Sequence, residues 1–151
     1  MNDTEQWRQL RALRARREER ARRARAEQRA HRNAIRSRIE SLEAGCDAER
    51  RARRDAARGF LADAEQRPLS HAERLAAQRA ESERDGEIDR LTRARASDQN
   101  ALAQADARLA ELDAAYRARQ WQTRALDKIV ARSAERGRRR AEARGDGSAD
   151  D

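Results

Sequence analysis

Side chains that commonly carry out catalysis or bind metals are few in this sequence and lie far apart. The two histidines, His31 and His71, are 40 residues apart, and the single cysteine, Cys46, has no plausible metal co-ligand nearby in sequence. No Gly-rich phosphate loop, G-x-S-x-G or H-E-x-x-H motif occurs. We therefore expect no enzyme, no metal site and no cofactor. Cys46 is expected to be an apolar packing residue, with metal ligation as the alternative.

Binding chemistry, in contrast, is concentrated near the C-terminus, in residues 119–140, RQWQTRALDKIVARSAERGRRR. Leu126 and Val130 continue a heptad repeat there, whereas Trp121 and Ile129 mark a second face about a quarter to a third of a turn away. Tryptophan and arginine are enriched at the energetic centres of protein interfaces. The pattern predicts a partner-binding face made of the following residues: Trp7, Arg117, Trp121, Arg124, Lys128, Ile129 and Arg132.

A second interpretation assigns these apolar residues to the interior. In that case Trp121 and Ile129 only widen the seam within the molecule, by packing against Trp7 and against Leu10 or Leu13. The two interpretations differ in whether Trp121 is exposed in the free protein.

The composition indicates long helices rather than a compact globular core. The chain has 151 residues, of which 42% are charged and 3% aromatic, so it can bury only a narrow apolar seam. Its commonest residues are strong helix formers. It has no apolar run of the roughly 20 residues that span a membrane, its N-terminus does not resemble a secretory signal, and its lone cysteine fits a reducing compartment. We expect a cytoplasmic protein without membrane insertion.

The one clear break in the helical pattern lies at residues 67–70. Pro68 disfavours helix, and Ser70 with Glu73 forms a capping-box signature for a new helix. The sequence predicts an all-α fold, a long antiparallel coiled-coil hairpin with helices over about 4–66 and 71–142. Residues 1–144 would form this hairpin and residues 145–151 a disordered acidic tail. The alternative is one helix kinked at Pro68 in a parallel dimer.

Heptad spacing predicts which residues form the seam between the two arms. Folding the chain about residue 68 places residue i opposite residue 136 − i, so that Phe60 meets Leu75 and Trp7 lies opposite Ile129. Residues 14–31 have no large aliphatic side chain, which predicts a weak and mobile partner segment. Gly45 and Gly86 fall near one level and suggest a soft joint, with tolerated drift as the alternative. The predicted seam consists of Ile35, Ile39, Leu42, Ile88, Leu91, Leu102, Leu109, Leu112, Tyr116, Leu126 and Val130.

Charge is distributed unevenly along the chain. Residues 1–38 carry a net charge of +8 and residues 114–144 carry +7, whereas residues 39–113 carry −4. An antiparallel hairpin brings the two basic segments together, where like charges repel. This asymmetry indicates an end that meets an acidic surface; a solvated arginine-rich helix is the alternative.

These features resemble the YscO/FliJ family of type III secretion and flagellar export. The similarity covers the length, the near-central turn, the two long helices and the segment LDKIVARSAERGRRRAEARGD, in which heptads pass into an Arg/Glu-rich run. The resemblance implies a central stalk that binds a hexameric secretion ATPase and links it to the export gate protein, with export chaperones as further partners. It implies a location peripheral to the inner-membrane export apparatus.

Two other functions fit the same residues. One is an arginine-rich coiled coil that binds nucleic acid, and the other is a structural adaptor that assembles with itself. The stalk predicts a monomer in solution with only non-specific nucleic-acid binding. The nucleic-acid-binding coiled coil predicts a steep loss of affinity between low and physiological salt. The adaptor predicts a dimer or a larger species.

Overall fold

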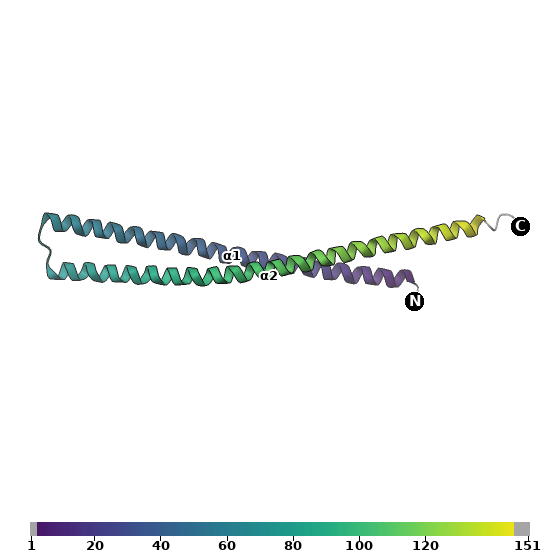
Figure 1. The fold of residues 1–151 in the computed structure, drawn as a ribbon, viewed down its shortest axis with the longest axis horizontal. Coiled ribbons are helices and arrows are strands. Elements are labelled where there is room, and N and C mark those ends of the chain that lie inside the picture. The colour runs from purple at the N-terminus through teal and green to yellow at the C-terminus, as the bar shows by residue number, and fades with distance from the viewer. Residues whose placement is uncertain (1–2, 147–151) are drawn as a thin grey trace. The chain divides into compact units, whose positions relative to one another are not determined.

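The computed structural model describes residues 3–146, which form two α-helices joined by one turn (Figure 1). Helix α1 spans Asp3–Gln66 and helix α2 spans His71–Asp146. The two-helix hairpin predicted from the sequence is therefore confirmed. No helix in the described part of the chain is both long and apolar enough to cross a membrane.

The turn has the capping geometry that the sequence indicates. The backbone N–H of Glu73 donates to Ser70 Oγ at 3.2 Å, and the backbone N–H of Ser70 donates to Glu73 Oε2 at 2.8 Å. These reciprocal bonds satisfy two donors that the first turn of a helix otherwise leaves unpaired. Helix α1 ends at Gln66, just before the residues that Pro68 restricts.

The C-terminal boundary of α2 differs from the expectation. The helix continues to Asp146, beyond the predicted end near residue 142, and therefore includes the first two residues of the expected disordered tail. Gly137 lies inside the helix with negative φ, and Arg144 places a cation in the last turn, where it favours the helix dipole. The rest of the expected tail, residues 147–151, lies outside the described residues.

The chain forms two compact units, each made from one segment of α1 and one of α2. The turn unit comprises residues 30–107, and the described part of the terminal unit comprises residues 3–29 and 108–146. In the turn unit, Arg38 pairs with Asp98 at 3.1 Å; in the terminal unit, Arg25 pairs with Asp113 at 2.5 Å. Both pairs follow the predicted antiparallel register to within two residues.

The turn unit contains most of the buried apolar side chains. Ile35, Ile39 and Ala105 form a cluster with Ala101 and Leu102. Leu91 is buried further toward the turn, where one of its methyl carbons lies 3.5 Å from the place that a Cβ on Gly45 would occupy. Cys46 is also buried, with its Sγ 3.9 Å from Thr92 Oγ1, which confirms it as a packing residue.

The residues predicted to form the seam are all at least partly shielded from solvent. None of its members is exposed in the structure. The buried members are Ile35, Ile39, Leu91 and Leu126, and the half-buried members are Leu42, Ile88, Leu102, Leu109, Leu112, Tyr116 and Val130.

The predicted pairing of Phe60 with Leu75 differs from the structure. Phe60 lines a groove with Arg74 and Ala77, and Leu75 is not part of that lining. Leu75 is exposed and borders Arg79 on another face of α2. Pairing residue i with residue 136 − i predicts which residues lie at the same position along the two helices. It does not predict which side of each helix they face, and this explains why Phe60 does not meet Leu75.

The glycines at the suggested joint do not interrupt either helix. Gly45 lies within α1 and Gly86 within α2, and both belong to the turn unit. The boundaries between the units fall elsewhere, at residues 29/30 and 107/108.

Candidate partner-binding face

Residues 14–31, predicted to be a weak partner segment, are helical and pair with α2 through polar contacts. Arg14 Nη1 donates to the backbone oxygen of Gln122 at 2.8 Å, and Arg119 Nη1 donates to that of Arg17 at 3.2 Å. The guanidinium of Arg25 pairs with Asp113 and lies 4.3 Å from the centre of the Tyr116 ring, a cation–π contact. Arginine therefore takes the structural place of the missing aliphatic residues.

Other arginines in the terminal unit also join α1 to α2. Arg11 Nε lies 2.9 Å from Asp127 Oδ1, which joins the two helices close to the buried Leu126. Arg29 lies within 3.8 Å of Asp113. Leu126 is the one fully buried apolar residue among the described residues of this unit. The seam here therefore combines ion pairs between the two helices with half-buried apolar side chains.

Trp121 projects away from this seam. At about 100° per residue, Trp121 lies about 140° from Leu126 and about half a turn from Val130. Its side chain is 72% exposed. The predicted separation of a quarter to a third of a turn is therefore too small for Trp121. Ile129 lies nearer the seam, about 60° from Leu126, and is 51% exposed.

These exposures rule out the interior interpretation for Trp121. Leu13, one of its suggested partners, is itself 45% exposed. Leu10 is half-buried and lines a groove with Ala115 and Ala118, and Trp121 is not part of that lining.

Trp7 does not belong with Trp121. It is half-buried and lines a groove with Val130, Ser133 and Ala134, on the seam side of α2. The predicted face is therefore wrong in this one member, because the register rule placed Trp7 at the level of Ile129 without specifying a side.

The four predicted cations lie on the same side of α2 as Trp121. Arg117 and Arg124 are four residues before it and three residues after it, spacings that bring side chains together on a helix surface. Lys128 and Arg132 follow at seven and eleven residues and lie within about 20° of Trp121. We define the Trp121 face as Arg117, Trp121, Arg124, Lys128, Ile129 and Arg132.

The cations of the Trp121 face are chemically unlike those of the seam. All four are exposed, and within residues 3–146 none forms an ion pair or a side-chain hydrogen bond. Their guanidinium and ammonium donors are therefore available to a partner. A large exposed indole among unpaired cations suits an acidic surface that also has an apolar pocket.

The strongest electrostatic perturbation in the described chain lies at the turn, not on this face. Arg67 forms a two-pronged pair with Glu73, at 3.1 and 2.6 Å, while Glu73 also receives the backbone N–H of Ser70. These bonds, with Arg67 the largest cause, lower the pKa of Glu73 to about 2. The capping box was readable from the sequence, but nothing in the spacing pointed to the role of Arg67.

Metal chemistry has no visible basis in the described residues. No group of three or more His, Cys, Asp or Glu side chains there is arranged to hold a metal ion. Cys46 is buried against Thr92, far in sequence from either histidine.

Comparison with protein-family models, with curated proteins and with solved structures finds no match for this chain. The resemblance to the YscO/FliJ family therefore remains a prediction from the sequence.

Proposed function

We propose that this chain is a helical coupling stalk of a bacterial type III secretion apparatus, without catalytic activity of its own. It would bind the hexameric secretion ATPase and link it to the export gate protein. The observation that carries the proposal is the Trp121 face, where a 72% exposed tryptophan lies among four cations that have no partner in the described chain. The family resemblance supplies the identity of the partner.

The physical role of each group on the face follows from its chemistry. Trp121 would anchor the contact by filling an apolar pocket, since buried aromatic anchors supply much of the binding energy of an interface. Arg117 and Arg124 would form forked hydrogen bonds with carboxylates beside that pocket. The cations would also speed association with an acidic surface, and this contribution should weaken as salt rises.

The test measures binding of the full chain to its cognate secretion ATPase at physiological salt, together with ATP turnover. We expect about one chain per ring and faster turnover. Trp121→Ala should weaken binding at least tenfold, as expected for a hot-spot residue. Leu13→Ala is the matched control, because Leu13 is an exposed apolar residue of the same unit on the other helix.

The charge contribution needs its own control. Replacing Arg117, Arg124 and Lys128 by glutamine should slow association and reduce its salt dependence. The matched variant replaces Arg16, Arg20 and Arg36 by glutamine, since these are exposed arginines of α1 without an ion pair among the described residues. If the two variants slow association equally, the effect comes from net charge alone and the Trp121 face is not a specific binding site.

A second candidate function, nucleic-acid binding, is favoured by the end of α2. Residues 131–144 are exposed on every side and carry six arginines, of which only Arg139 is ion-paired within the described chain. Such a helix can neutralise phosphates without reading bases. Tight duplex DNA binding that persists at physiological salt, with no effect on the ATPase, would favour this function. A dimer in sedimentation would favour the self-assembling adaptor.

A further inference from the structure

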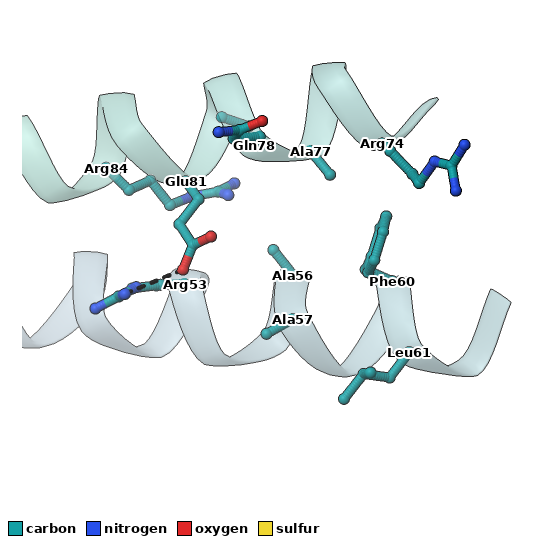
Figure 2. Close-up of a pocket in the computed structure, with 11 residues that line it drawn as sticks. Arg53, Ala56, Ala57, Phe60, Leu61, Arg74, Ala77, Gln78, Glu81 and Arg84 are labelled. Atoms are coloured by element: carbon teal, nitrogen blue, oxygen red, sulfur yellow. Dashed lines mark hydrogen bonds and ion pairs between the residues drawn. The ribbon is translucent and has the colours of Figure 1, made fainter. Parts of the chain in front are cut away.

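A second candidate surface lies in the turn unit, where α1 and α2 leave a groove of about 370 Å³ (Figure 2). We call it the turn groove. Alanines from both helices line it, and Phe60 extends from α1 toward α2 while Leu61 points away from α2. The apolar lining consists of Ala56, Ala57, Phe60, Leu61, Ala77 and Ala80.

The groove exists because side chains at this level are too small to fill the space between the helices. Ala77, two heptads before Leu91, and the nearby Ala80 are half-buried, and both side chains are smaller than the leucine and isoleucine found deeper in the turn unit. Leu61 is 62% exposed beside this space, and that leaves a large apolar side chain in water. Covering the groove would therefore remove apolar surface from water, which is favourable.

The arginines that line the groove differ in whether they have a counter-charge. Arg53 is neutralised by Glu81 at 3.0 Å and by Asp85 at 3.2 Å. Arg74 and Arg84 also line the groove, but neither has an ion pair or a side-chain hydrogen bond within residues 3–146. Arg84 is half-buried as well. Two cations without a counter-charge beside an apolar lining suit a partner that carries anionic groups.

We propose that the turn groove binds an acidic amphipathic helix of a partner protein. Arg74 and Arg84 are ten residues apart on one helix, or about 15 Å along its axis. The ligand would place carboxylates against these two cations and apolar side chains over Phe60 and the alanines, with Leu61 at the edge of the contact. Helices commonly bind to grooves through such a combination of apolar anchors and flanking charges. This inference does not depend on the proposed function, which concerns a different face.

Two other occupants fit less well. A second copy of this chain, related by two-fold symmetry, would bring Arg74 and Arg84 toward their own counterparts and add repulsion. Nucleic acid would satisfy the cations but would leave the apolar lining and Leu61 without a partner, since phosphate contacts need no apolar floor.

The experiment uses the full chain and a synthetic helical peptide of about 20 residues. The peptide carries two glutamates eleven residues apart, which fall on one face about 16 Å apart, with leucines four and seven residues after the first. Binding is followed by fluorescence anisotropy at physiological salt. We expect saturable binding that Arg74→Glu with Arg84→Glu weakens at least tenfold. Leu61→Ser should also weaken it.

The matched control is Arg51→Glu with Arg79→Glu, which changes net charge equally at exposed arginines outside the groove lining. It should leave the affinity within about twofold. A peptide with lysine in place of the two glutamates should bind the Arg74→Glu/Arg84→Glu variant better than it binds the natural chain. Circular dichroism and urea unfolding would establish that each variant is folded.

Three results would overturn the proposal. The first is absence of peptide binding at physiological salt, or an equal loss in the control variant, which would reduce the attraction to net charge. The second is a dimer in sedimentation that Leu61→Ser dissociates, which would assign the groove to a second copy. The third is duplex DNA that displaces the peptide and itself depends on Arg74 and Arg84. Binding to the secretion ATPase that depends on Trp121 is a separate measurement on a different face, so either proposal can fail while the other stands.

Discussion

The cap of α2 gives the most sharply defined test of the structure. Ser70→Ala removes the oxygen that accepts the backbone N–H of Glu73 at 3.2 Å. Loss of such a cap costs about 1 kcal/mol of unfolding free energy. Glu73→Gln is the complementary change, because glutamine can still accept the backbone N–H of Ser70 but carries no charge for Arg67. It should cost less than Ser70→Ala at neutral pH.

The pH dependence of the Glu73 variant follows from the depressed pKa. Bonds from Arg67 and Ser70 lower the pKa of Glu73 from 4.5 to about 2 in the folded chain. A depressed pKa means that the folded state favours the carboxylate, so its contribution to stability is fully present above pH 4.5. It should decline as the pH falls toward 2. The difference between the natural chain and Glu73→Gln should therefore shrink over that interval.

Urea unfolding followed by circular dichroism measures these differences at a series of pH values. Glu83→Gln serves as the control, because Glu83 is exposed and has no ion pair or side-chain hydrogen bond in the described chain. A difference for Glu73→Gln that stays constant from pH 7 to pH 2 would refute the assigned charge interaction. A Ser70→Ala variant as stable as the natural chain would refute the capping geometry.

Three further predictions concern the two units. Gly45→Ala and Gly86→Ala should each raise the unfolding free energy by about 1 kcal/mol, since a Cβ would lie at ordinary van der Waals distance from Leu91 at Gly45 and would meet nothing within 4 Å at Gly86. A lower unfolding free energy in urea would instead support the soft joint suggested from the sequence. Asp113→Asn should cost about 1–2 kcal/mol by unpairing the half-buried Arg25, and hydrogen exchange should rise in the terminal unit but not in residues 30–107. Cys46, 2% exposed, should react with a thiol reagent far more slowly in the folded chain than in urea; equal rates would contradict its burial.

The fold was predictable because its signals are local. Pro68, Ser70 and Glu73 specify the turn through backbone restriction and capping, which need no tertiary information. The heptad positions specify the seam for the same reason, since a period of seven maps directly onto one side of a helix.

The candidate surfaces were harder to predict because they depend on which side of a helix a residue faces, as well as on its position along the helix. Trp7 and Trp121 carry the same indole, but one borders the seam and the other is exposed. The turn groove is space between the two helices that the small side chains of Ala77 and Ala80 leave unfilled. The sequence of either helix alone does not reveal this space. In residues 14–31, arginine bonds to backbone oxygens join the two helices, and a search for hydrophobic patterns does not detect such contacts.

The distribution of buried side chains connects the stability of the terminal unit to its proposed role. Leu126 is the only buried apolar residue among its described residues. The rest of its seam combines half-buried apolar side chains with exposed or half-buried ion pairs, which are individually weak. A ligand that binds only the paired helices stabilises them by mass action. A partner on the Trp121 face would therefore lower hydrogen exchange at Leu126, on the opposite side of α2, if it selects the paired state. Unchanged exchange there on binding would show that α2 is recognised as a single helix, independent of its pairing with α1.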